Sequence, residues 1–181
     1  MKYFALVIVV LSWITVSGQH YMPIDAESSV EFKVKNFGST VKGRFTGLSG
    51  KVVFDVKAVT NAAFDVTVKA ASIDTGIGMR DNHLRKNEYL STADYPTLRF
   101  VSSKVVSDKL GHGTVTGLLT IKKITREVSI PFTYSLIGET LILKGEFHLN
   151  RRDYDVGGNS ISLSDEVMVM LRVIAKRFNE R

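Results

Sequence analysis

The sequence predicts an all-β protein, an antiparallel eight-stranded barrel with one helix-bearing insertion at about residues 74–96. Apolar and polar side chains alternate with a period of two along most of the chain, which is typical of strands with one buried face. Only one segment of appreciable length departs from this alternation. Eight or nine such strands must close into a barrel or split into a sandwich, and the long polar opposite face favours a barrel.

Nine runs of alternating side chains predict the strands, and short turns such as residues 36–39 and 47–50 join them. The runs are Val30–Val34, Val41–Phe45, Val52–Val56, Ala62–Ala70, Leu98–Phe100, Val115–Ile121, Val128–Tyr134, Leu141–Leu149 and Val167–Val173.

The segment Arg80–Leu90 is predicted to be the one substantial helix. Asp81 is a plausible N-cap, and Leu84 and Glu88 have the i, i+4 spacing of one helix face. Pro96 prevents the helix from continuing. The insertion therefore interrupts an otherwise regular succession of strands.

The first eighteen residues are predicted to be a cleaved secretory signal peptide. A basic start is followed by an apolar run from Tyr3 to Ile14 and by small residues up to Gly18. The run is too short for a spanning helix, which needs about 20 apolar residues, although an uncleaved anchor remains the alternative. We expect a periplasmic or secreted protein, cleaved near Gly18-Gln19, with one domain over residues 19–181.

Composition excludes several kinds of chemistry. The chain has 181 residues and no cysteine, which excludes thiolate zinc sites and redox CxxC motifs. Its four histidines show no metal-ligand spacing, and neither a phosphate loop nor a nucleophile elbow is present. We therefore expect no metal and no cofactor, and the residues indicate no catalytic set. The formal net charge of +6 favours anionic membranes or envelope polymers over nucleic acid.

Candidate ligand-binding residues follow from the phase of the phenylalanines. Seven of them share the main apolar face of their own strands, and this face either fills a core or lines the lumen of a barrel that holds one slim ligand. Two methionines on the last strand add flexible packing suited to a lipid tail. The proposed lumen residues are Phe32, Phe45, Phe54, Phe64, Phe100, Phe132, Phe147, Met168 and Met170.

Three arginines are candidates for the mouth of the barrel. Arg126 and Arg151 continue the apolar phase of their strands, and Arg172 shares a face with Met168 and Met170. If those faces point inward, these cations could hold an anionic or polar headgroup. The alternative is that each of them extends to solvent at a strand end.

Several short motifs follow one another along the chain. They are Tyr21-x-x-Ile24-Asp25, Ser29-Val30-x-Phe32-x-Val34, Gly43-x-Phe45-x-Gly47, Ser72-Ile73-Asp74-Thr75-Gly76, Arg80-Asp81-x-His83-Leu84, Tyr95-Pro96-x-Leu98-x-Phe100, Gly117-x-Leu119-Thr120-Ile121, Ile124-Thr125-Arg126, Leu149-x-Arg151-x-Asp153-Tyr154-x-Val156-Gly157 and Ser164-Asp165-Glu166-Val167. Taken in this order, these segments resemble the YceI-like family of polyisoprenoid- and lipid-binding proteins. The chain departs from the family at Lys123, where glycine is frequent, and at Asn36, where many members carry histidine.

The resemblance implies a lipocalin-like barrel that carries or sequesters a long apolar lipid, such as an isoprenoid quinone or a polyprenyl phosphate, without catalysis. Arg80 and Asp81 would pair to fix the helix across the barrel, or the two residues would contact the ligand. We expect a lipid partner and transient contact with a membrane surface. The sequence leaves open whether the protein forms a homodimer. The alternatives are an envelope stress or interaction protein without a bound lipid, and a small barrel enzyme acting on a lipid-like substrate.

Overall fold

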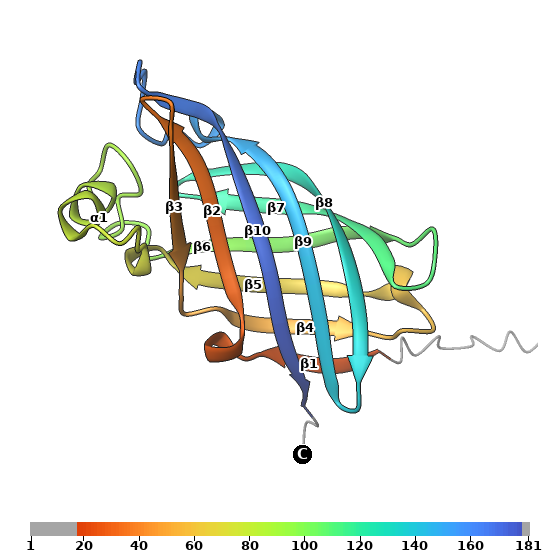
Figure 1. Ribbon diagram of the computed structural model, residues 1–181. Coiled ribbons are helices and arrows are strands. Elements are labelled where there is room, and N and C mark those ends of the chain that lie inside the picture. The colour runs from red at the N-terminus through yellow and green to blue at the C-terminus, as the bar shows by residue number, and fades with distance from the viewer. Residues whose placement is uncertain (1–17, 179–181) are drawn as a thin grey trace, which may run out of the picture.

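The computed structural model describes residues 18–178, which form ten antiparallel strands, one α-helix and four 3₁₀ turns (Figure 1). The predicted signal segment lies outside the described residues except for Gly18. The strands are β1 (Gln19–Pro23), β2 (Ser29–Asn36), β3 (Ser39–Phe45), β4 (Ser49–Phe54), β5 (Ala63–Lys69), β6 (Thr97–Val106), β7 (His112–Ile121), β8 (Ile124–Ile137), β9 (Thr140–Asn150) and β10 (Leu163–Arg177). The helix is α1 (Gly78–Leu84), and the 3₁₀ turns are η1 (Asp25–Glu27), η2 (Val59–Asn61), η3 (Ala70–Ser72) and η4 (Arg151–Tyr154).

Eight strands close into a ring, which confirms the predicted barrel. From β4 to β10, each strand pairs with the next along the chain, and β1 pairs with both β4 and β10. The closing contact sets Tyr21 opposite Arg177. Six of the eight pairings around the ring join strands that are consecutive in the chain. Alternation along each strand decides which side chains face inward.

The β2–β3 hairpin replaces β1 and β4 in the wall at one end of the barrel. Strand β10 is long enough to pair with β2 along its first part and with β1 at its last residues. The outer edge of β3 is attached to the insertion by a single bridge between Arg44 and Asp74, whose side chains also form an ion pair of 2.8 Å. The alternation of apolar and polar side chains did not predict β1, because its five residues, which end at Pro23, are too few to show the pattern.

The insertion lies where it was predicted, but its helix is shorter and begins earlier. It spans seven residues and ends at Leu84, before weak helix formers such as Asn87. The prediction of Asp81 as the N-cap was wrong. Asp81 is a buried residue inside the helix, and its carboxylate accepts hydrogen bonds from the backbone N–H and hydroxyl of Thr75. Leu84 packs in the cluster that includes Phe32 and Phe45, which holds this short helix against the end of the barrel beside β3 (Figure 1).

Candidate functional site: an apolar cavity at one end of the barrel

The end of the barrel that carries α1 contains a cavity of about 370 Å³. Ligand pockets in proteins usually enclose roughly 300–1,000 Å³. Most of the lining is apolar, because the inward phases of β2, β3 and β5 to β10 contribute valine, leucine, isoleucine or phenylalanine. Strand β10, for example, contributes Val167, Val169, Leu171 and Val173. Such a wall favours an apolar ligand through the hydrophobic effect.

Four of the seven predicted lumen phenylalanines line this cavity: Phe32, Phe45, Phe100 and Phe147. The rings of Phe32 and Phe45 lie 5.7 Å apart on the neighbouring strands β2 and β3. Phe32 lies over Gly43 so closely that a β-carbon at Gly43 would collide with its ring. A glycine opposite the ring therefore keeps Phe32 against the wall and the space in front of it open.

The other three, Phe54, Phe64 and Phe132, lie beyond the cavity and close the opposite end of the barrel. Together with Tyr134 they form a cluster of edge-to-face and tilted rings, with centroids 5.1 to 6.4 Å apart. Phe54 is almost wholly buried. All seven phenylalanines thus face inward, but the two interpretations of that face apply to different halves: one half is a packed core and the other is hollow.

The placement of Met168 and Met170 in the lumen was wrong. They alternate along β10 with Val167, Val169 and Leu171, and only those three belong to the cavity lining. Period-two alternation therefore puts both methionines on the outer face of the wall. Arg172 lies on that same outer face, where its guanidinium donates to the carbonyl of Glu27 at 2.9 Å, so its assignment to the mouth was also wrong.

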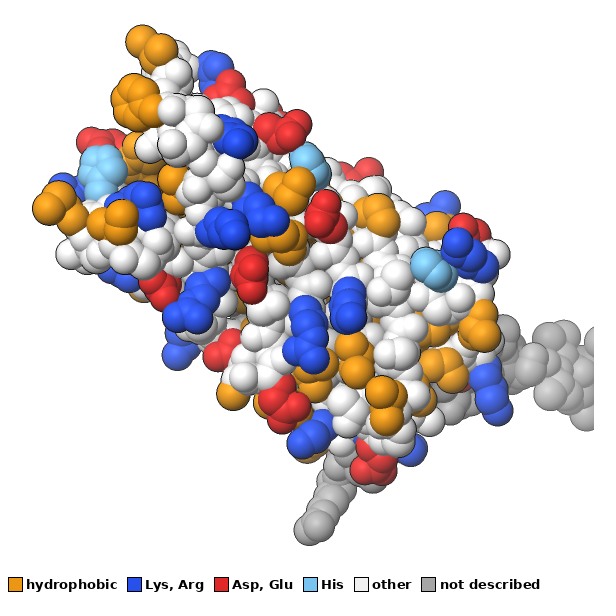
Figure 2. All heavy atoms as spheres, in the orientation of Figure 1, with side chains coloured by type: hydrophobic (Ala, Val, Ile, Leu, Met, Phe, Trp, Pro, Cys, Tyr) orange, Lys and Arg blue, Asp and Glu red, His pale blue; other side chains and the backbone are white. Residues whose placement is uncertain are grey.

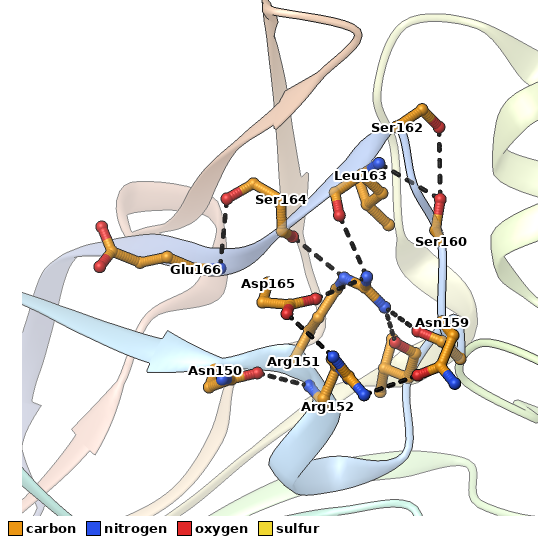
Figure 3. A network of polar contacts seen from close by, with 12 residues as sticks. Asn150, Arg151, Arg152, Asn159, Ser160, Ser162, Leu163, Ser164, Asp165 and Glu166 are labelled. Carbon is orange, nitrogen blue, oxygen red and sulfur yellow. Dashed lines mark hydrogen bonds and ion pairs between the residues drawn. The ribbon is translucent and has the colours of Figure 1, made fainter.

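Arg151 lines the cavity, yet all five of its N–H groups are already bound (Figure 3). Nε donates to the carbonyl of Ser164, Nη1 to the carbonyls of Val156 and Gly158, and Nη2 to the carbonyl of Leu163 and the carboxylate of Asp165. A guanidinium offers five N–H donors, so none remains for a headgroup. Its role is to fix residues 155–162, hereafter the 155–162 loop, and the start of β10.

Arg126, the third predicted mouth cation, lies exposed at the same end of the barrel. Its Nε donates to the carbonyl of Asp153 at 3.3 Å, and it does not belong to the cavity lining. Of the three predicted arginines, only Arg151 therefore lies at the cavity.

Asn36 and Tyr154 are among the polar lining residues that the sequence interpretation did not assign to the site. In the described part of the chain, Asn36 Oδ1 and the Tyr154 hydroxyl are the buried side-chain atoms without a hydrogen-bond partner. Burial, with a smaller effect of the Asp153 charge, raises the pKa of Tyr154 to about 12, so the phenol stays neutral and remains a donor. Such orphan groups are costly unless a ligand or water satisfies them.

Asn36 carried a signal in the sequence. It continues the inward phase of Val30, Phe32 and Val34, so it is the one polar side chain at the end of an apolar face. Tyr154 carried none, because it lies in the 3₁₀ turn η4, where no strand period applies.

The cavity lining contains two further arginines, Arg99, which forms an ion pair of 2.7 Å with Asp65, and Arg80. Arg80 Nε donates to the hydroxyl of Thr75 at 2.7 Å, and Arg80 Nη2 donates to the carbonyl of the same residue at 2.8 Å. Asp81 binds Thr75 as well, so the two residues fix the helix through Thr75 instead of pairing with each other.

The insertion and the 155–162 loop are tied together beside the mouth of the cavity. Lys122, at the turn between β7 and β8, has a nearly buried side chain and donates to the carbonyls of Asp155 and Asn87. The backbone N–H of Gly157 donates to the carbonyl of Glu88 at 2.8 Å. Three segments far apart in sequence therefore form one side of the rim.

Within residues 18–178, no group of three or more histidine, aspartate or glutamate side chains is placed to bind a metal ion. None of the helices in this range has the length and apolar character that crossing a bilayer requires.

The fold and the cavity define a β-barrel that is packed at one end and hollow at the other, with an apolar ligand chamber. A family model described as the YceI-like domain matches residues 21–175, and the chain belongs to this family. A protein from Burkholderia cenocepacia, BcnA, has a similar structure, with a TM-score of 0.81, 26% identity, and coverage of 85% of this chain and 99% of BcnA.

Two further solved structures share the fold. The YceI protein of Campylobacter jejuni has a TM-score of 0.73 at 22% identity, covering 99% of this chain and 100% of that one. A polyisoprenoid-binding domain from Saccharophagus degradans has a TM-score of 0.70 at 14% identity, covering 90% and 100%. Among curated proteins, a UPF0312 protein of Shewanella denitrificans is 36% identical over 106 residues, which is 58% of this chain and 56% of the relative.

Proposed function

We propose that this protein is an exported, non-catalytic carrier that holds a long apolar lipid, of the polyisoprenoid or isoprenoid quinone type, in the cavity of its barrel. The observation that carries the proposal is the division of the barrel: aromatic rings close one end, and a cavity with apolar walls lies at the other. A closed end and an open end suit a linear molecule that enters by its tail. The polyisoprenoid-binding domain that shares the fold supports this ligand class.

Two unpaired polar atoms at the cavity suit a small uncharged polar group on the lipid. Arg151 has no free N–H group, so it offers nothing to a phosphate. The neutral Tyr154 hydroxyl can donate to a carbonyl or hydroxyl oxygen, and Asn36 Oδ1 can accept from a hydroxyl. These two atoms suit a quinone or an alcohol, whereas a polyprenyl phosphate would have to bind Arg80, whose hydrogen bonds to Thr75 use two of its five N–H groups.

The test is to identify what the purified protein carries. The chain is expressed with its own first eighteen residues, collected from the periplasm or the medium, and extracted with organic solvent for mass spectrometry. We expect a stoichiometric isoprenoid lipid. An empty protein that also fails to bind added quinones and prenyl alcohols would refute the carrier function and favour the hypothesis of an interaction protein. Turnover of the lipid would establish an enzyme.

Two neighbouring residues of β10 provide a matched pair of variants. Leu171 lines the cavity and Met170 lies on the outer face of the same strand. Leu171→Gln puts a polar amide into the apolar chamber and is expected to abolish lipid retention, whereas Met170→Gln is expected to preserve it. Equal retention in both variants would show that the lipid lies elsewhere.

A further inference from the structure

Four apolar side chains project from the rim of the cavity into solvent. Phe37, at the tip of the β2–β3 hairpin, is 85% exposed, and Met79 at the start of α1 is 86% exposed. Ile77 precedes α1 and is half exposed, and Ile161 in the 155–162 loop is fully exposed. They come from three separate segments at the open end, where Figure 2 shows hydrophobic side chains projecting beside cationic ones. We call these four residues the apolar rim.

The backbone conformation at Phe37 shows that a phenylalanine does not stabilise this turn. Phe37 and Gly38 occupy the two central positions of a tight hairpin turn with φ values of +48° and +76°. Glycine, asparagine or aspartate is preferred at both positions, and a bulky aromatic residue there is disfavoured. An exposed ring also contributes no burial to folding. A residue that is unfavourable in both respects points to a role outside the fold.

The hairpin that carries Phe37 is basic. Lys33, Lys35 and Lys42 lie on its outer face, since β2 directs Val34 and Asn36 into the cavity and Lys33 is in register with Lys42. Within residues 18–178, none of the three lysines forms an ion pair. The hairpin's one acidic residue, Glu31, lies farther from the tip, in register with Arg44. An apolar tip flanked by unpaired cations is typical of segments that insert into the interface of an anionic bilayer.

We propose that the apolar rim docks on the surface of a bilayer that contains anionic lipid, with the lysines against the headgroups and the cavity mouth facing the acyl region. The inference rests on the proposed carrier function for its purpose, because a long apolar lipid cannot leave the cavity through water at a useful rate. The rim consists of separate projecting side chains, which can each insert into lipid. A stable dimer needs a continuous face of about 800 Å² per partner.

The opposite end of the molecule provides controls that are also exposed. Leu110, in the β6–β7 turn, is 85% exposed, and Ile137, before the β8–β9 turn, is also exposed. Lys57 and Lys109 are exposed cations at that closed end. Simple surface hydrophobicity or net charge would make these residues as important for vesicle binding as the rim.

The experiment measures flotation of the protein, without its first eighteen residues, with phosphatidylcholine vesicles that do or do not contain phosphatidylglycerol. The ring begins at Gln19 and ends at Arg177, so this chain contains the whole barrel. We expect binding to the anionic vesicles only, weakened about fivefold for each cation removed in Lys35→Gln and Lys42→Gln. The double variant Phe37→Ser, Met79→Ser is expected to lose binding, and Leu110→Ser with Ile137→Ser, or Lys57→Gln with Lys109→Gln, to retain it.

Three results would overturn the docking surface: no binding by the unmodified protein, equal losses in rim and control variants, or a rim-dependent dimer that excludes vesicles. Lipid content, measured on the same samples, separates this inference from the carrier function. If the protein contains lipid but does not bind vesicles, the docking surface alone is refuted. If it binds vesicles through its rim but contains no lipid, the carrier function alone is refuted.

Discussion

Replacing Arg151 by alanine is expected to lower the free energy of unfolding by about 3–5 kcal/mol. The side chain is 3% exposed and donates five hydrogen bonds. Hydrogen bonds from a charged group contribute about 1.5–3 kcal/mol each, which would give a larger total. The carbonyls of the 155–162 loop can turn to water once the arginine is gone, however, and removing the cation also removes its cost of burial, so the lower range applies.

Arg152 is the matched control for this prediction. It follows Arg151 in the chain and pairs with the same carboxylate of Asp165, but its side chain is half exposed. Exposed ion pairs contribute at most about 1 kcal/mol, so Arg152→Ala should scarcely change stability.

Urea unfolding followed by circular dichroism measures both variants, and limited proteolysis reports on the loop. We expect Arg151→Ala to expose the 155–162 loop to cleavage while Arg152→Ala does not. Arg151→Lys should lie between alanine and the unmodified protein, because one ammonium can reach some of the five acceptors but not all. If Arg151→Ala and Arg152→Ala cost the same, the assignment of Arg151 as the residue that fixes the loop would be wrong.

Three further changes test other parts of the molecule. Phe54→Ala, at the closed end, should cost about 3–5 kcal/mol in urea unfolding because it leaves a hole among packed rings; a cost below about 1 kcal/mol would show that this end is not packed. Folding raises the pKa of Tyr154 from 10.0 to about 12, so stability is complete below pH 10 and falls as the pH rises toward 12, by about 2–3 kcal/mol. Tyr154→Phe should reduce that alkaline loss without removing it, since the pKa of Tyr21 is also raised, and an unchanged pH profile would contradict the assignment. Gly43→Ala should push the ring of Phe32 into the cavity and reduce lipid retention in the extraction assay, with little change in the circular dichroism spectrum.

The barrel could be predicted because local pattern and global closure agree. In β5 and in β7 to β9, the alternation of apolar and polar side chains indicates which face is inside. Short connections place strands that are consecutive in the sequence next to each other in the sheet. The same rule misassigned Met168 and Met170, where the apolar residues on both faces of β10 left the phase ambiguous. An outward methionine on a half-buried wall is as apolar as an inward valine, so composition alone does not separate the faces.

The division of the barrel into a packed end and a hollow end could not be predicted from phase. Phe64 and Phe100 have the same relation to their strands, yet one closes the barrel and the other lines the cavity. The difference depends on position along the barrel axis, which is set by strand stagger. The role of Arg151 was equally hidden, because its five acceptors are mostly backbone carbonyls whose positions no side-chain pattern encodes.

The seam between β1 and β10 has a consequence for the order of folding. Residues 21–23 find their partners at residues 175–177, almost the whole chain away, whereas most other strands pair with a neighbour across a short turn. The meander from β5 to β10 can therefore form as the chain appears, but the cylinder cannot shut until the last strand is complete. A ribosome that still holds the end of β10 would keep the barrel an open sheet, unable to retain anything inside.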